Sequence, residues 1–283
     1  MNSGWLLLLL PGLIWGASFL FIAEALRALE PNGITFARIL IGFTTLALFP
    51  AARKPVERAD WPAVAWLGVL WFAFPLSMFP FAEQRVSSAL TGMLNGANPL
   101  FATLAASFLA RKAPSGGVAA GLAVGLAGTI LIALPAANEG ENSAIGIAMI
   151  LAALVSYGVA LSIARSLQQK YGGIPVIWRA QAVGLALTAP LGLPDLLRAH
   201  WMPGPLLSLL ALGVFGTALA NVLMAAAAGR FGAARASSTT FLIPVVALAL
   251  GVAVRQEHVA GLSVVGCVVS LAGAWLMKRA SAH

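Results

Sequence analysis

Residues 115–134 read SGGVAAGLAVGLAGTILIAL, a run of twenty positions without a charged side chain. A helix needs about 20 mostly apolar residues to cross the hydrocarbon core of a bilayer. Because backbone groups in lipid must find their hydrogen-bond partners within the protein, a run of this kind folds as a helix. The stretch therefore predicts a transmembrane helix.

The rest of the chain has the same character, since 60% of its 283 residues are hydrophobic and only 9% are charged. Soluble domains carry about 25% charged residues. Short connections rich in Pro, Gly and charge separate the apolar runs, which lie at about 4–24, 31–50, 61–81, 86–109, 115–134, 144–166, 174–193, 203–226, 233–254 and 258–277. The sequence predicts an all-α integral membrane protein with ten transmembrane helices and no sizeable domain outside the membrane.

The distribution of Lys and Arg predicts the orientation of these helices. The formal net charge of +8 would suggest nucleic acid in a soluble protein, but here the basic residues lie in short connections. Their expected partner is anionic membrane lipid rather than nucleic acid. Eleven Lys and Arg lie in the terminal segments and even-numbered connections, against four in the odd-numbered ones. Since Lys and Arg are enriched on the cytoplasmic side, both termini are expected in the cytoplasm of a cell, inner or plasma, membrane.

A weak internal repeat divides the chain into residues 1–138 and 139–283. A shift of 145 residues aligns Arg85 with Arg230, Pro99 with Pro244, and Leu126-Ala127-Gly128 with Leu271-Ala272-Gly273. Because each half contains five predicted helices, an odd number, the two halves must be inverted relative to each other. Inverted repeats with a substrate site near the bilayer midplane are typical of secondary transporters. A duplication that serves packing alone is the alternative.

Two five-helix repeats, each closing with a Pro-containing and a Gly-rich helix, resemble the drug/metabolite transporter superfamily, in particular its ten-helix EamA-type branch. The segment Met93-Leu94-Asn95-Gly96-Ala97-Asn98-Pro99 and the pair Ala220-Asn221 are similar to the YddG-type amino-acid exporters of that branch. The resemblance implies export of amino acids or similar metabolites through a central cavity. The branch commonly carries a Glu after helices 4 and 9; Glu257 fits the second position, whereas Arg111-Lys112 occupies the first.

Polar residues beside two prolines are the first candidates for substrate binding. Pro99 and Pro244 lie in the middle of the fourth and ninth predicted helices, where a proline removes a hydrogen bond and kinks the helix. The neighbouring polar candidates, together with one in helix 8, are Thr91, Asn95, Asn98, Ser237, Thr240 and Asn221. Hydrogen bonding between helices, without a substrate, is the alternative role for each of them.

Large side chains inside the predicted helices form a second group of candidates. Trp15, Trp71, Met78 and Tyr157 are expected to line an apolar pocket suited to large neutral or aromatic side chains. The alternative is that they face lipid or neighbouring helices. With this pocket, the predicted function is a secondary transporter that exports neutral or aromatic amino acids by alternating access.

Two arginines, Arg38 and Arg179, lie inside predicted helices and are functional candidates by default. Glu24 and Glu83 are possible partners of Arg38 in an outer gate, while snorkelling to lipid headgroups is the alternative. The sequence has no phosphate-binding loop, and its Asp and Glu residues fall in predicted loops or at span ends. Proton-coupled transporters usually need an ionisable group deep in the membrane, so a facilitator or an exchanger is expected.

Small residues at four-residue spacing in helices 5 and 10 predict close helix packing. They make these helices a scaffold or the contact of a possible homodimer, and they are Gly117, Gly121, Gly125, Gly266, Ser270 and Ala274. No clustered catalytic groups, metal ligands or cofactor motifs accompany them, so an enzyme is not expected. An exporter or flippase for drugs or lipid-linked amphiphiles on the same scaffold stays open, because a fold does not fix its substrate.

Overall fold

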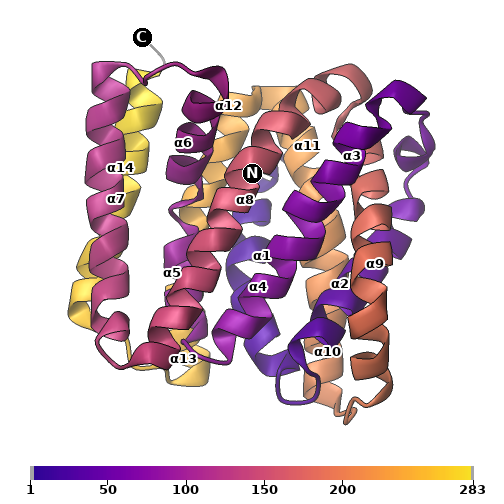
Figure 1. The fold of residues 1–283 in the computed structure, drawn as a ribbon, viewed down its shortest axis with the longest axis horizontal. Helices are drawn as coiled ribbons and strands as arrows, with labels where there is room; N and C mark the ends of the chain where they lie inside the picture. The colour runs from indigo at the N-terminus through magenta and orange to yellow at the C-terminus, as the bar shows by residue number, and fades with distance from the viewer. Residues whose placement is uncertain (1–2, 282–283) are drawn as a thin grey trace.

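The computed structural model describes residues 3–281, and within this range all of the regular secondary structure is helical (Figure 1). The α-helices are α1 (Ser3–Ala25), α2 (Pro31–Ala47), α3 (Trp61–Leu67), α4 (Phe74–Glu83), α5 (Ser88–Asn95), α6 (Asn98–Ala110), α7 (Gly116–Ala137), α8 (Glu141–Tyr171), α9 (Gly173–Leu197), α10 (Pro203–Ala211), α11 (Ala220–Phe231), α12 (Ala233–Ala236), α13 (Leu242–Arg255) and α14 (Gly261–Ala280). Short 3₁₀ turns are η1 (Pro50–Arg53), η2 (Arg58–Asp60) and η5 (Ser237–Phe241), and π-helical turns are η3 (Gly68–Ala73) and η4 (Leu212–Leu219).

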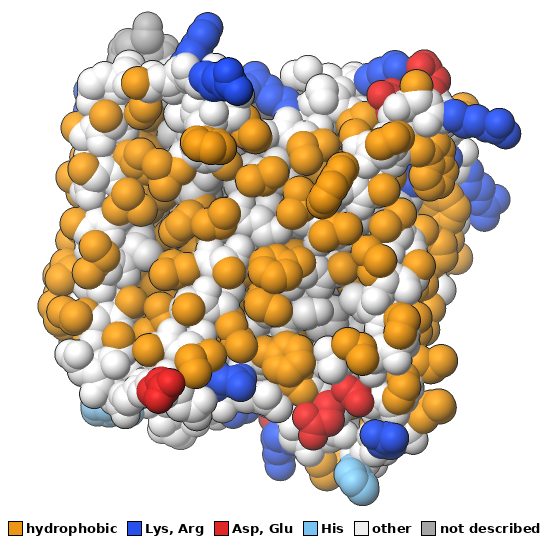
Figure 2. Space-filling view, viewed as in Figure 1, with side chains coloured by type: hydrophobic (Ala, Val, Ile, Leu, Met, Phe, Trp, Pro, Cys, Tyr) orange, Lys and Arg blue, Asp and Glu red, His pale blue; other side chains and the backbone are white. Residues whose placement is uncertain are grey.

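Eight helical segments of the described range are long and apolar enough to cross a membrane. Two predicted spans fall short of that length: α2 has 17 residues, and the fourth span is divided into α5 and α6. Figure 2 shows a wide hydrophobic band with charged side chains gathered at its two edges, as a membrane protein requires. The all-α membrane architecture is confirmed, while the count of ten spans stays a prediction.

Helices α7 and α14 pack against each other through their glycines at one edge of the molecule (Figure 1). A Cβ atom on Gly128 would lie 2.2 Å from the Ser270 nitrogen, and one on Gly273 would lie 2.2 Å from the Gly125 nitrogen. The small residues therefore serve a contact within one chain, where they let two backbones approach closely. A homodimer through these helices stays a prediction, and it would have to use their other faces.

The prolines of the fourth and ninth spans lie at helix breaks rather than at kinks within continuous helices, which corrects the expectation from sequence. The fourth span is interrupted after Asn95, and Pro99 is the second residue of α6. Pro244 is the third residue of α13, which follows the 3₁₀ turn η5. Proline is favoured in the first turn of a helix because no helical partner is waiting for its missing N–H there. The two breaks touch, since a Cβ on Gly96 would lie 2.9 Å from the Pro244 Cγ.

Local irregularities recur at the spacing of the internal repeat. The π-helical turn η3 begins at Gly68, and the position 145 residues later, Gly213, lies in the π-helical turn η4. Arg111 and Gln256, also 145 residues apart, end α6 and α13 with left-handed backbone angles of φ 52° and 55°. Non-glycine residues adopt this conformation rarely, so its recurrence at equivalent positions indicates the same local fold in both halves.

The buried core is divided into three hydrophobic clusters, and one residue links them. The clusters centre on Met93, on Leu67 and on Leu100, and Tyr157 of α8 packs against all three. Tyr157 therefore lies at the centre of the molecule, where the expected substrate site would be.

Candidate functional site

Side chains from four elements converge on the π-helical turn η4. The indole of Trp15 (α1) donates a hydrogen bond to the Gly216 carbonyl at 3.0 Å. Gln181 (α9) and Asn221 (α11) both donate to the Thr217 carbonyl, at 2.9 and 3.0 Å. A π-helical turn departs from the regular hydrogen-bond ladder of a helix and is frequent at functional sites. Here its carbonyl groups are available to side chains from neighbouring helices.

Arg38 of α2 joins this centre, and 5% of it is exposed. Its Nε donates a hydrogen bond to the Thr217 hydroxyl at 3.3 Å, the one hydrogen bond of its guanidinium with the described part of the chain. Glu24 pairs with Arg27 and Arg255 instead, so the expected Arg38–Glu24 contact is not formed. The burial of Arg38 also argues against snorkelling, and its guanidinium retains unused donors at the centre of the molecule.

Glu83, the other expected partner of Arg38, is the last residue of α4. Both of its carboxylate oxygens are buried, and neither has a hydrogen-bond partner among the described residues. The predicted Arg38–Glu83 ion pair is therefore also absent from this structure.

The break in the fourth span places unsatisfied amides beside the core. Asn95 ends α5 and is 9% exposed, yet its side chain makes no hydrogen bond within residues 3–281. The Oδ1 of Asn98 is buried without a partner. Thr91, in contrast, donates to the Ser87 carbonyl of its own helix at 3.0 Å. The two asparagines thus hold hydrogen-bonding capacity that the protein itself does not use.

The aromatic candidates are brought together around Tyr157. Trp15, Met78 and Tyr157 pack against one buried cluster, while Trp71 and Tyr157 pack against the next. The Tyr157 ring stacks on Phe79 with a centroid distance of 6.0 Å. Together with Arg38 and the η4 turn, these side chains give the centre one cationic group and several aromatic faces.

Three further candidates lie in local contacts away from this centre. Thr240 donates to the Ser237 carbonyl at 2.8 Å within the turn η5. Arg179 donates to the Ala52 and Pro175 carbonyls, at 3.0 and 3.1 Å, and lies over the Trp178 ring. Arg179 thus has the structural role that was one of its two predicted alternatives.

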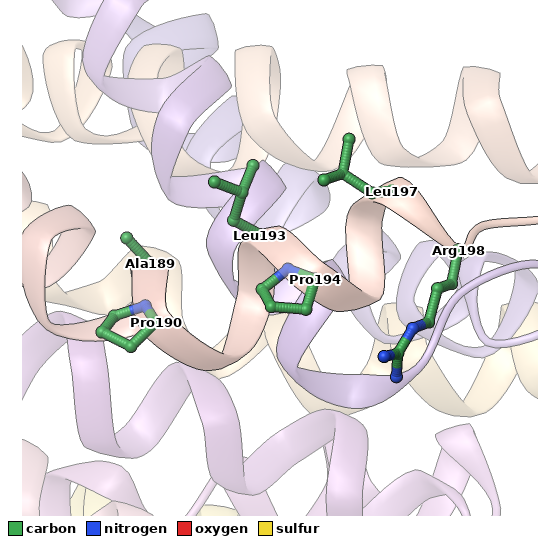
Figure 3. Close-up of a pocket in the computed structure, with 6 residues that line it drawn as sticks. All are labelled: Ala189, Pro190, Leu193, Pro194, Leu197 and Arg198. Atoms are coloured by element: carbon green, nitrogen blue, oxygen red, sulfur yellow. The ribbon is translucent and has the colours of Figure 1, made fainter.

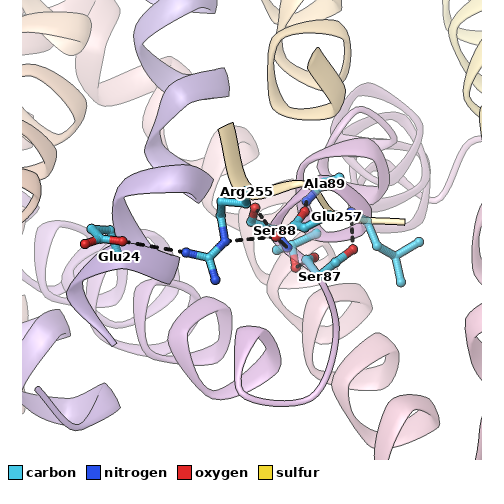
Figure 4. A network of polar contacts seen from close by, with 8 residues as sticks. Glu24, Ser87, Ser88, Ala89, Arg255 and Glu257 are labelled. Carbon is cyan, nitrogen blue, oxygen red and sulfur yellow. Dashed lines mark hydrogen bonds and ion pairs between the residues drawn. The ribbon is translucent and has the colours of Figure 1, made fainter. Parts of the chain in front are cut away.

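A polar network that the sequence did not reveal joins α1, α5 and the end of α13 (Figure 4). Glu257 accepts hydrogen bonds from the Ser88 nitrogen at 3.1 Å, the Ser88 hydroxyl at 2.8 Å and the Ala89 nitrogen at 2.8 Å. Arg255 bridges Glu257 at 3.1 Å and Glu24 at 3.8 Å. A carboxylate here caps the first turn of a helix from another part of the chain, which the helix dipole favours. We refer to Glu24, Ser88, Ala89, Arg255 and Glu257 as the Glu257 network.

Two pockets open on the surface of the molecule. One, of about 380 Å³, is lined from Ala189 to Arg198 by α9 and the residue that follows it (Figure 3). The other, of about 510 Å³, lies between α1, α10 and α13 beside the Glu257 network, and Phe21, Glu24 and Arg255 line it. The central candidate residues line neither of these two pockets. Among the described residues, no group of three His, Cys, Asp or Glu side chains is placed to hold a metal ion.

The sequence pattern of the EamA-like transporter family matches residues 2–134 and 144–279 of this chain. An uncharacterized transporter of Archaeoglobus fulgidus is 26% identical over 276 residues, which cover 97% of this chain and 98% of that protein. A probable terminal-alkyne amino-acid exporter of Streptantibioticus cattleyicolor is 25% identical over 278 residues, covering 96% of this chain and 92% of that protein.

One crystal structure shares the fold at 19% sequence identity. Its TM-score is 0.66, and the match covers 98% of this chain and 96% of the solved one. The same arrangement of helices therefore exists in a protein of distant sequence.

Proposed function

The chain belongs to the EamA-like transporter family, and from this premise we propose that it exports neutral or aromatic amino acids by alternating access. That it is a multi-pass membrane transporter rather than an enzyme follows from its family, its named relatives and its apolar helices. The amino-acid assignment is supported by one relative named as a probable amino-acid exporter. Arg38 is the structural observation that carries it.

A buried guanidinium without an acidic partner is well suited to a substrate carboxylate. Arg38 keeps its Nη donors free of protein acceptors, and guanidinium–carboxylate hydrogen bonds are short and strong. The unpartnered amide of Asn95 can accept a hydrogen bond from the substrate ammonium, and Trp15 and Tyr157 can contact its side chain. Each half of a zwitterionic amino acid then meets a group that the protein leaves unused.

Alternating access is proposed to occur between two inverted halves, residues 1–138 and 139–283. Helix packing supports this pairing: α7 contacts α14, α2 contacts α9, and the α5 segment contacts α13. Each of these pairs joins one half to the corresponding part of the other. The broken fourth and ninth spans would rock against the glycine-packed pair α7 and α14. Transport is then either facilitative or an exchange.

Both termini are proposed to lie in the cytoplasm of an inner or plasma membrane, which places the Glu257 network at the outer end. The orientation can be tested by replacing Cys267, which is buried, with Ala and adding one cysteine at a time. With a membrane-impermeant maleimide on intact cells, Arg198→Cys should be labelled and Lys54→Cys should not. The reverse pattern would overturn the orientation.

A second candidate, export of drugs or lipid-linked amphiphiles, is favoured by the 510 Å³ pocket. That pocket joins apolar residues, such as Phe21, to the charged side chains of Glu24 and Arg255, and it lies at the surface rather than at the centre. An amphiphile could enter such a pocket from the side of the membrane. The amino-acid proposal and this one make opposite predictions for mutations at the centre.

The test is uptake of a labelled panel by purified protein in liposomes. The panel contains bulky neutral amino acids, small neutral amino acids and amphiphilic cations. Saturable uptake of the bulky neutral amino acids that protein-free liposomes lack would support the proposal. Transport of the amphiphiles alone would favour the second candidate.

A further inference from the structure

The anomaly that calls for an explanation is the carboxylate of Glu83. Its position in the sequence, at the end of a predicted span, suggests an exposed side chain. In the structure both carboxylate oxygens are buried and accept no hydrogen bond from any described residue. Such a group is rare, because buried polar atoms nearly always have partners.

The charged groups around Glu83 are engaged elsewhere. Those that act on it electrostatically are Glu257 and Arg255, from the end of α13, and Arg38 of α2, which also interacts with Tyr157 of α8. Arg255 forms its ion pairs with Glu257 and Glu24. The only ion pairs described place no cation within 4.0 Å of Glu83.

The next basic residue in the chain does not neutralise Glu83 either. The Nη1 of Arg85 donates to the Phe81 carbonyl at 2.6 Å, and the Nε of Arg85 is itself buried without a partner. A negative carboxylate in this setting would be a buried, unpaired charge, at a penalty of several kcal/mol. A proton removes that charge and needs no cavity.

We propose that Glu83 holds a proton while the Glu257 network is closed and exchanges it with the outer solution when the network opens. This inference rests on the proposed function and selects exchange over facilitation. As a substrate molecule leaves through the open outer end, the Glu83 carboxylate takes up one proton from outside. Closure of the network carries that proton inward, and Glu83 releases it to the cytoplasm before the next substrate binds. One proton enters for each substrate molecule exported.

The contacts of the Glu257 network suggest how opening and protonation are linked. Arg255 is the cation that stands between Glu24, Glu257 and the surroundings of Glu83. While Arg255 is paired with the other two acids, Glu83 has no counterion and is neutral. When α13 moves away from α1 and α5, water enters, and the free carboxylate becomes hydrated.

The experiment uses the full-length protein in liposomes that contain a pH-sensitive dye, with the membrane potential clamped by valinomycin and potassium. An outward gradient of labelled phenylalanine should drive protons inward, and both fluxes are recorded on the same sample. Glu83→Gln should still exchange labelled for unlabelled phenylalanine, while its substrate-driven proton flux falls to the level of protein-free liposomes. Glu139→Gln, an exposed acid in the connection between α7 and α8, is the matched control and should behave like the wild type.

Several results would overturn the inference and leave amino-acid transport intact. These are wild-type phenylalanine transport without proton flux, unchanged proton flux in Glu83→Gln, or dependence on sodium instead of protons. Loss of affinity in Glu83→Gln for phenylalanine but not for its deaminated analogue would instead assign Glu83 to the substrate ammonium. If Glu83→Gln does not fold, Glu83→Asp replaces it, and the pH at half-maximal proton flux should shift.

A substrate-independent arm separates this inference from the proposed function. In a Cys267→Ala background, Ser87→Cys at the start of α5 reports opening of the outer end by its maleimide labelling rate. The rate should depend on pH, and Glu83→Gln should abolish that dependence whether or not phenylalanine is carried. A pH-independent rate in the wild-type background would overturn the inference. Absence of all amino-acid transport, with this dependence intact, would overturn only the proposed function.

Discussion

Glu257, just after α13, accepts a hydrogen bond at 2.8 Å from the hydroxyl of Ser88 in the first turn of α5, 169 residues earlier in the chain. The same carboxylate accepts from the backbone nitrogens of Ser88 and Ala89. It therefore fastens the end of the ninth span to the beginning of the fourth. In the proposed orientation this contact closes the outer end.

Glu257→Ala should open that end. The substitution leaves two backbone N–H groups of α5 and the side chain of Arg255 without their acceptor, and hydrogen bonds to charged groups contribute roughly 1.5–3 kcal/mol each. Maleimide labelling of Ser87→Cys in a Cys267→Ala background should become several-fold faster. Glu139→Ala serves as the control on the same side of the membrane. Equal labelling rates in the two variants would show that the Glu257 network does not hold the outer end closed.

Gly273→Ala should weaken the pair α7 and α14. An added Cβ would lie 2.2 Å from the Gly125 nitrogen, so the two helices must move apart. Overpacking of this kind destabilises by about 1–3 kcal/mol. The melting temperature in detergent should fall, whereas that of Gly261→Ala, at the open start of the same helix, should not. Equal melting temperatures would mean that the two backbones are not in close contact.

Arg38→Gln should reduce affinity for the substrate carboxylate. Loss of a charged hydrogen bond of roughly 1.5–3 kcal/mol corresponds to a rise in KM of roughly 10- to 100-fold. Uptake of the corresponding amine, which lacks the carboxylate, should be unaffected. Arg179→Gln is the matched comparison, because Arg179 bonds only backbone carbonyls and should lower stability without this selectivity. Equal losses for the amino acid and the amine would assign Arg38 to packing.

Asn95→Leu should separate a role in transport from a role in folding. The Asn95 amide makes no hydrogen bond with the described residues, so its removal should not lower the melting temperature. Substrate uptake should fall nevertheless, since the substrate loses an acceptor. Asn221→Ala, by contrast, breaks a 3.0 Å hydrogen bond to the Thr217 carbonyl and should lower stability. A destabilised Asn95→Leu with normal uptake would contradict the assigned role.

Local sequence patterns were sufficient to predict the helices and their small-residue contacts. The run at 115–134 corresponds to α7, and its glycines meet those of α14 as the spacing suggested. Pro99 was expected to kink a continuous helix, but the neighbouring Gly96 and the close approach of Pro244 produce a break instead. That contact joins distant parts of the chain and cannot be derived from local propensity.

The candidate site was predictable in part. Trp15, Tyr157 and Asn221 do lie around the centre, whereas Gln181, with a buried Oε1 that lacks a partner, was missed as one polar residue in an apolar run. The partner of Glu257 could not be foreseen, because capping by a residue from the other half leaves no pattern at Ser88. Nor does a span-end position reveal that neighbouring helices bury the Glu83 carboxylate.

The central claim is that this chain carries amino acids by alternating access, and counterflow in liposomes tests it most directly. Liposomes loaded with unlabelled phenylalanine at high concentration are diluted into a trace of labelled phenylalanine. The account predicts a transient accumulation of label above its outside concentration, reduced in Arg38→Gln at low substrate concentration. No accumulation for phenylalanine or any other neutral amino acid, by protein that is folded and correctly inserted, would contradict it.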